Sequence, residues 1–275
     1  MYATLATTAC LTALNASPST AQTEKGDWDA YVTSPPGGKP MSTVVDLSLA
    51  ERAPMKDRGY AVLVRTSLLS ADSDGMPTKR ESESLHLLED LLEKSLAESC
   101  RAVYAGRFTH KGVRRFVFYT SDTACCRKTV ASAFTSSPGH EWDARAVADT
   151  GWSNYFDLLY PPPVELERIR NRRLVDLLTD KGDDLKSPRR VDHFLRFKSK
   201  SSRESFLRGL SMEGFEIAAM PEADGDGSHP YALQLHRKDK PDYPMVDKVV
   251  IPLWEKAQKS NGRYEGWETY LVRHP

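Results

Sequence analysis

Three consecutive prolines, Pro161–Pro163, divide this 275-residue chain into two parts. Proline has no backbone N–H and a fixed φ, so such a run can neither continue a strand ladder nor enter a helix interior. The parts before and after the prolines are each long enough to bury a core of their own. We therefore predict one domain over residues 27–163 and a second over residues 164–275, preceded by a leader at residues 1–26.

The first 21 residues are rich in Ala, Thr, Leu and Ser and contain no acidic residue. No Lys or Arg precedes the apolar stretch, and Thr and Asn dilute it, which is atypical of a signal peptide. We expect a disordered leader or a misplaced start codon on a cytoplasmic protein, with export as the alternative. No later segment is long and apolar enough to span a membrane.

The first part alternates between strand-like and helix-like segments. Apolar, β-rich runs predict strands at residues 42–49, 60–69, 102–108, 113–119 and 141–148, and His110-Lys111-Gly112 predicts a hairpin. One helix is expected from Thr78, with Glu81 completing a capping box and leucines at helical spacing on one face, and another over residues 123–134. The order β-β-α-β-β-α-β predicts an antiparallel sheet with its helices on one face.

The second part begins with an amphipathic helix over residues 164–179. Its polar face carries Arg168, Arg170, Arg172 and Arg173, and we expect this face to be solvated because acidic neighbours dilute the charge. Strands are predicted at residues 191–197, 215–220, 231–236 and 263–272, with helices at 201–213 and 242–261. This β-α-β-β-α-β order is the split βαβ, or ferredoxin-like, arrangement. The whole chain is therefore expected to be α+β, with two antiparallel sheet-plus-helices domains.

Trp-x-x-Tyr segments occur in both parts, at Trp28–Tyr31, Trp152–Tyr155 and Trp267–Tyr270. The recurrence suggests two domains of related build. Tyr264 and Trp267 lie three residues apart on one expected strand, so their side chains should face opposite sides of the sheet. We expect one of them in the core and the other as an anchor for a partner.

Several segments of the second part resemble the regulator of ribonuclease E activity B (RraB) family. They are Leu177–Asp184, Val191–Leu195, Gly214–Ile217 and, most specifically, Tyr264–Tyr270 with its Tyr-Glu-Gly-Trp ending. The first part, with Asp74–Pro77, Val103–Arg107 and Trp152-x-x-Tyr155, resembles a bacterial family of unknown function often paired with it. The resemblance implies a non-enzymatic protein that binds ribonuclease E and inhibits or redirects its cleavage of RNA. It assigns no role to a numbered residue.

Charge narrows the class of partner. Lys plus Arg and Asp plus Glu both number 38, and this balance argues against a dedicated nucleic-acid coat or a membrane-surface protein. Residues 186–208 are locally basic, with eight Lys or Arg against Asp192 and Glu204. Such a segment is either a solvated surface or a contact for RNA or an acidic protein segment. The candidate partner-binding residues are Arg189, Arg190, Tyr264 and Trp267, and direct RNA binding is the alternative function.

No catalytic or cofactor motif is present in the sequence. The seven histidines form no metalloprotease pattern, and phosphate-loop, nucleophile-elbow and dinucleotide fingerprints are missing. The acidic segments at residues 70–81 and 222–227 fit turns better than calcium loops. Cys10, Cys100, Cys125 and Cys126 have neither zinc-site nor redox-pair spacing, so free thiols are expected. We predict no catalytic residue, metal or cofactor, with an enzyme whose cleft lies between the domains as a further alternative.

Overall fold

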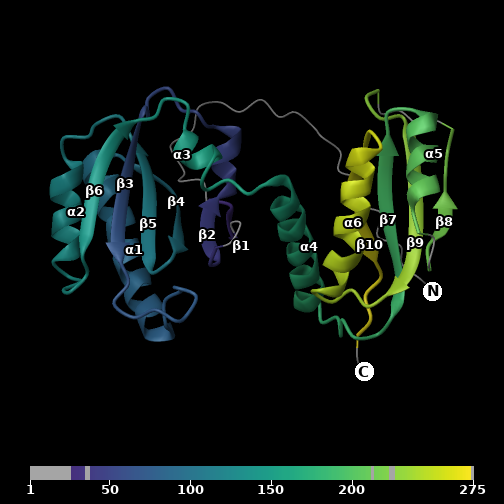
Figure 1. The fold of residues 1–275 in the computed structure, drawn as a ribbon, viewed down its shortest axis with the longest axis horizontal. Coiled ribbons are helices and arrows are strands. Elements are labelled where there is room, and N and C mark those ends of the chain that lie inside the picture. Colours follow the sequence, from purple (N-terminus) through teal and green to yellow (C-terminus); the bar gives the residue numbers. More distant parts are fainter. Residues whose placement is uncertain (1–25, 35–37, 212–213, 223–226, 274–275) are drawn as a thin grey trace.

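The structure, a computed structural model, describes residues 26–34, 38–211, 214–222 and 227–273. These residues form two antiparallel sheets with helices packed on them, which confirms the predicted α+β class (Figure 1). Apart from Gly26, the predicted leader at residues 1–26 lies outside the described residues. Among the described helices, none is both long enough and apolar enough to cross a bilayer.

The first sheet has six strands in the order β1-β2-β4-β5-β3-β6. The strands are β1 (Trp28–Thr33), β2 (Met41–Asp46), β3 (Tyr60–Ser67), β4 (Val103–His110), β5 (Val113–Thr120) and β6 (Trp142–Ala148). All neighbouring pairs are antiparallel. The strand β1 was not expected, and the segment predicted as a strand to residue 49 turns at Asp46 into a short 3-10 helix, η1 (Leu47–Glu51). Asp46 ends the strand because its carboxylate accepts the backbone N–H of Ser48.

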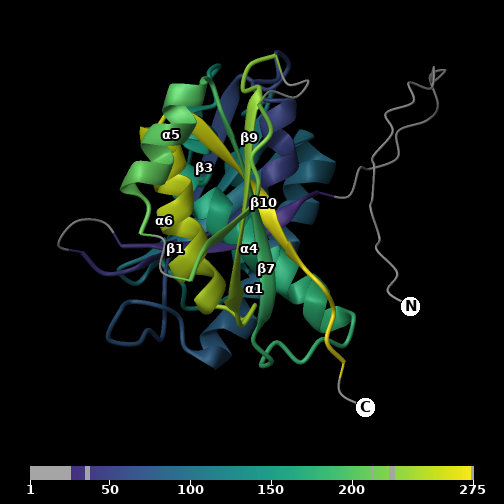
Figure 2. The ribbon, with the colours of Figure 1, turned by 90° about the vertical axis from the view of Figure 1, so that its right-hand side faces the viewer.

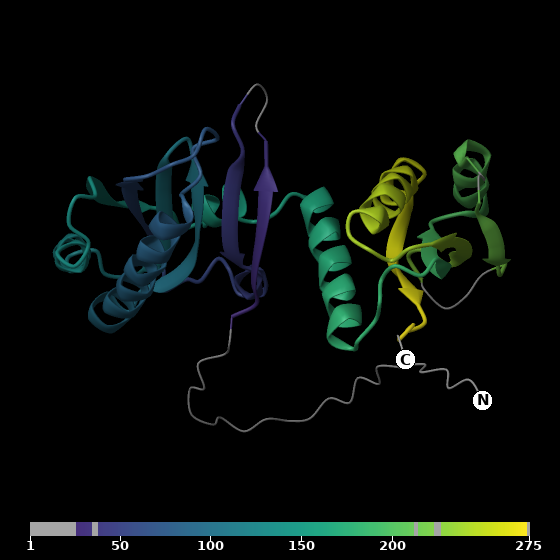
Figure 3. The same cartoon turned by 90° about the horizontal axis from the view of Figure 1, so that it is seen from below.

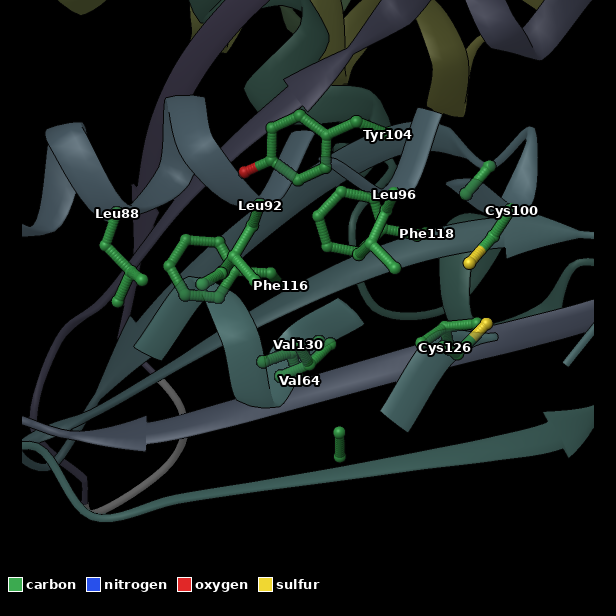
Figure 4. Packing of buried hydrophobic residues seen from close by; sticks show 14 of the residues in the cluster. Val64, Leu88, Leu92, Leu96, Cys100, Tyr104, Phe116, Phe118, Cys126 and Val130 are labelled. Carbon is green, nitrogen blue, oxygen red and sulfur yellow. The ribbon is translucent and has the colours of Figure 1, made fainter. Parts of the chain in front are cut away.

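Two helices, α1 (Lys79–Cys100) and α2 (Cys126–Phe134), cover one face of this sheet. The predicted leucine stripe of α1 packs on the aromatic rings of β4 and β5 (Figure 4). The capping box predicted for α1 is wrong, because Thr78 makes no side-chain cap. Glu81 is buried instead, and its carboxylate accepts the backbone N–H of Leu69 and contacts the imidazole of His140.

The opposite face of the first sheet is also covered, so the prediction of helices on one face alone is wrong. It packs against η1, the short helix α3 (Ser153–Phe156) and the chain that follows α3. The Trp152 ring stacks on Tyr119 at 3.8 Å between centroids, and Trp152 itself has a left-handed backbone with φ of 57°. The Tyr155 hydroxyl donates to the carbonyl of Asp46 at 2.9 Å. Trp152 and Tyr155 are therefore part of the core of the first domain.

The second sheet has four antiparallel strands in the order β10-β7-β9-β8. Its elements are β7 (Arg189–Phe197), α5 (Lys200–Gly209), β8 (Glu216–Ala219), β9 (Tyr231–Asp239), α6 (Met245–Lys259) and β10 (Gly262–Thr269). The predicted β-α-β-β-α-β order is confirmed. Strand order differs between the two sheets, so the aromatic segments do not reflect a shared build. Trp28 and Trp267 lie on strands, whereas Trp152 precedes a helix.

The helix α4 (Pro163–Asp180) lies between the two sheets (Figure 3). Its Ile169 packs in the first domain, while Val175 and Leu178 belong to the core of the second. The arginine face stays partly exposed, and each of its four arginines also pairs with an acid. Arg168 contacts Asp247, Arg170 contacts Glu167, Arg172 contacts Asp29, and Arg173 contacts both Asp27 and Asp29.

The expectation of free thiols is wrong for two cysteines of the first domain. Cys100 and Cys125 form a disulfide, while Cys126 is free and buried. The β4–β5 hairpin reverses the chain and returns the start of α2 to the end of α1, which places the two Cα atoms 5.9 Å apart. The spacing in the sequence did not show this return. Cys10 lies outside the described residues.

Candidate interaction surface

The four-stranded sheet of the second domain has two unlike faces. On β7, Val191, His193, Leu195 and Phe197 point inward and are buried, whereas the alternate residues point outward. Helices α5 and α6 lie on the inner face, as Figures 2 and 3 show. The outward side chains of β7, β9 and β10 form what we call the outer sheet face. Its strand side chains are not covered by helices α5 and α6.

One ion-paired group on the outer sheet face centres on Asp192. Its carboxylate accepts two hydrogen bonds from the Arg190 guanidinium, at 2.6 and 2.8 Å, and one from the Gln234 amide at 3.0 Å. Burial acts to raise the pKa of Asp192, but the bonds from Arg190 and Gln234 outweigh it and hold the pKa below its usual value. Asp192 therefore stays ionised and fixes the Arg190 side chain, which is 49% exposed.

A second ion-paired group centres on Glu265. Arg196 Nε donates to this carboxylate at 3.0 Å and Arg263 Nε donates at 2.9 Å. The half-buried Phe194 lies on β7 between Asp192 and Arg196, and so separates the two ion-paired groups. The outer sheet face is thus a set of paired charges around an aromatic ring. Such a surface suits a protein partner with mixed charge better than a polyanion.

The two predicted arginines lie on opposite sides of β7. Arg190 is exposed on the outer sheet face, but Arg189 is only 2% exposed. The Arg189 Nη2 atom donates to Asp183 at 2.6 Å, and the same carboxylate accepts the backbone N–H of Val272 at 2.9 Å. The Asp183 carboxylate therefore joins Arg189 at the start of β7 to the segment after β10. A role of Arg189 and Arg190 in partner binding stays a prediction. Of the two side chains, only that of Arg190 is exposed enough for a partner to contact.

Tyr264 and Trp267 both point inward, so the prediction that they face opposite sides is wrong. The register of β10 against β7 shifts between Tyr264 and Gly266, and this bulge restores both aromatics to the inner face. The Tyr264 hydroxyl contacts Nδ1 of His193 at 2.8 Å, and the Trp267 Nε1 atom donates to Asn171 at 3.0 Å. Their exposed fractions of 6% and 7% place both in the core. Direct contact of these two rings with a partner stays an untested prediction.

Four of the eight bases at residues 186–208 are neutralised by acids within the chain. Arg189, Arg190, Arg196 and Lys200 pair with acids, and the buried Arg203 donates to two backbone carbonyls. A phosphate backbone would have to compete with these partners. The segment is therefore a poorer RNA-binding surface than its sequence indicates.

A cleft of about 510 Å³ lies between the domains, at the seam of β1 and α4. Its charged residues are Glu165, Arg168 and Arg172, and each is ion-paired. Among the described residues that line it there is neither His nor Cys, so it offers no activated nucleophile of the Ser–His or Cys–His kind. The geometry does not favour the enzyme alternative.

Comparison with known proteins supports the family assignment. Residues 168–269 match the family model described as Regulator of ribonuclease activity B. Residues 168–269 therefore form an RraB-type domain. Residues 26–160 match a family of unknown function, DUF695.

The RraB domain also matches an individual protein. A protein named Regulator of ribonuclease activity B, from Shewanella denitrificans, is 27% identical over 103 residues, which are 37% of this chain and 80% of that protein. A solved structure of an unknown protein from Galdieria sulphuraria is 11% identical, with a TM-score of 0.21. It covers 78% of this chain and 99% of its own.

Proposed function

We propose that this chain is a non-enzymatic regulator that binds ribonuclease E through its RraB domain and inhibits or redirects RNA cleavage. The observation that supports this most is the match of residues 168–269 to a family of regulators of ribonuclease activity. The proposal places the chain in the bacterial cytoplasm, where RNA decay takes place. It requires a contact surface for protein, and we assign that role to the outer sheet face.

The composition of the outer sheet face supports a protein contact. The half-buried Phe194 offers an apolar centre, and the ion-paired arginines around it form a polar rim that a partner can meet without a large desolvation penalty. Arg190 is the member of the predicted set that a partner can reach. The buried Arg189, Tyr264 and Trp267 then contribute indirectly, because they hold the sheet that carries this face.

The decisive experiment is a pull-down of the purified protein against ribonuclease E, scored beside cleavage of a standard transcript. We expect saturable binding together with slowed or redirected cleavage. Phe194→Ser and Arg190→Glu should each weaken binding by about tenfold or more, because they alter the centre and the rim of the contact. Lys248→Glu, a substitution at an exposed position of α6 on the helix-covered side, is the matched charge control and should bind normally.

Three other outcomes separate the alternatives. Absence of binding at physiological salt would sink the regulator function in this chain. Loss of binding in Lys248→Glu alone would keep the function and move the contact to the helix side. A salt-dependent shift with naked RNA would favour the RNA-binding alternative, and turnover without a partner would favour the enzyme.

A further inference from the structure

Three cysteines of the first domain gather where α1 ends and α2 begins. Cys100 is the last residue of α1, Cys125 is the N-cap of α2, and Cys126 is its first residue. Their sulfur atoms all lie within 4.8 Å of one another. Cys100 and Cys126 are each 3% exposed, and their sulfur atoms point toward each other in Figure 4. Two of these sulfurs form the disulfide and the third belongs to the free thiol of Cys126.

The backbone around the three sulfurs is held by contacts that do not involve the disulfide. The Thr120 hydroxyl donates to the carbonyl of Cys100 at 2.7 Å and accepts the backbone N–H of Asp122 at 3.1 Å. The carbonyl of Asp122 in turn accepts the thiol of Cys126 at 3.5 Å. Both helices are also packed into the core of the first domain. The three sulfurs should therefore stay close together after the disulfide is reduced.

Three adjacent sulfurs are a donor set that thiophilic d¹⁰ cations prefer. A zinc–sulfur bond is about 2.3 Å long, so thiolates around one tetrahedral Zn²⁺ lie roughly 3.8 Å apart. The observed spread, within 4.8 Å, is close to this requirement once the bonded pair separates. An open groove of about 500 Å³, lined by Cys125, Lys128 and Thr129, gives solvent access to the Cys125 side of the cluster. Access and donor set together are what a binding site requires.

We propose that Cys100, Cys125 and Cys126 form a redox-gated binding site for one thiophilic cation of the Zn²⁺ or Cu⁺ class. In the oxidised form the disulfide occupies two of the three donors and closes the site. A dithiol transfers two electrons and two protons to the disulfide, which gives two thiols and the oxidised reductant. Binding of Zn²⁺ then forms three sulfur–zinc bonds, releases three thiol protons to solvent and leaves the fourth position to water.

The test is a zinc titration of the full-length protein against a chromophoric zinc indicator, after reduction with dithiothreitol and anaerobic buffer exchange. We expect the reduced protein to bind one Zn²⁺ per chain with an affinity at least about tenfold above that of the oxidised protein. Cys126→Ser keeps the Cys100–Cys125 pair but removes one of the three donors. After reduction, this variant should bind Zn²⁺ at least about tenfold more weakly than the reduced wild type. Cys10→Ser removes the fourth cysteine of the chain and should bind like the wild type.

A second measurement covers the case in which the Cys126→Ser variant fails to fold. In the reduced wild-type protein, Zn²⁺ should slow alkylation of Cys100, Cys125 and Cys126, but not of Cys10, as read by peptide mass spectrometry. Equal zinc binding by the oxidised and reduced proteins would overturn the proposal. The proposal would also be overturned if Zn²⁺ left the alkylation rates of the three cysteines unchanged. The disulfide would then be a crosslink between α1 and α2 and nothing more.

Discussion

Gly266 allows β10 to bury both Tyr264 and Trp267. Its φ is 138°, a conformation that L-residues rarely adopt, although a Cβ at this position would meet no atom within 4 Å. We predict that Gly266→Ala lowers the free energy of unfolding by about 1–3 kcal/mol through backbone strain alone. Urea unfolding followed by tryptophan fluorescence measures the change.

The matched control for Gly266→Ala is Gly227→Ala in the same domain. The φ of Gly227 lies outside the range that L-residues rarely adopt, and a Cβ there also meets open space. That variant should stay within about 0.5 kcal/mol of the wild type. If both substitutions have the same small effect, the bulge does not depend on the glycine backbone.

His193 makes the second domain sensitive to acid. Burial lowers its pKa from the usual 6.5 to about 4, so the folded protein keeps it neutral. The unfolded chain binds a proton at His193 near pH 6.5, and the folded chain does not. The contribution of His193 to the free energy of unfolding is therefore fully present above pH 6.5. It is lost as the pH falls from 6.5 toward 4.

We predict a loss of about 2 kcal/mol between pH 7 and pH 5 from His193. Urea unfolding at several pH values should show this slope in the wild type. His193→Gln keeps a polar group beside Tyr264 but does not titrate, so its slope over the same range should be flatter. An unchanged slope in this variant would assign the acid sensitivity to other groups.

At the scale of single elements, Asn171 attaches α4 to the second domain. Its amide donates to Asp247 on α6 at 2.8 Å and its carbonyl oxygen accepts from Trp267 on β10 at 3.0 Å. Asn171→Leu leaves the Asp247 carboxylate and the Trp267 N–H without the Asn171 amide as a partner. We therefore predict that the substitution lowers the free energy of unfolding by about 2–4 kcal/mol. A double-mutant cycle with Trp267→Phe should recover part of the loss, because the indole N–H is then gone. Additive losses would mean that the Asn171–Trp267 bond contributes nothing.

The same elements show which features could be predicted from the sequence. The strand predicted at residues 191–197 is present, and its alternate side chains lie on opposite faces because no bulge interrupts it. On β10 the identical reasoning failed, since a single extra residue at the bulge reverses the alternation. Arg189 was taken for a surface residue because its partner Asp183 lies in a preceding loop whose path no local pattern shows. The Cys100–Cys125 pair needed the same kind of non-local information.

At the scale of the whole molecule, α4 is shared between two cores, although the prolines place it with the second domain. Residues 168–269 match the RraB family, and this range contains most of α4. Val175 and Leu178 pack in the second core, while Ile169 closes the second face of the first sheet. The ion pairs from Arg172 and Arg173 to β1 are partly exposed and contribute little by themselves. Burial of apolar surface therefore decides to which domain the helix belongs.

This reasoning predicts how the chain can be divided. A fragment of residues 162–275 retains α4 and should unfold cooperatively in urea, whereas residues 182–275 lack Val175, Leu178 and Asn171 and should not fold stably. The shorter fragment exposes the inner aromatics, because the partner of Trp267 is missing. Circular dichroism and urea titration of both fragments measure the difference. If residues 182–275 fold as stably as the longer fragment, α4 is only a linker, and the boundary at residues 163–164 should move to the end of the helix.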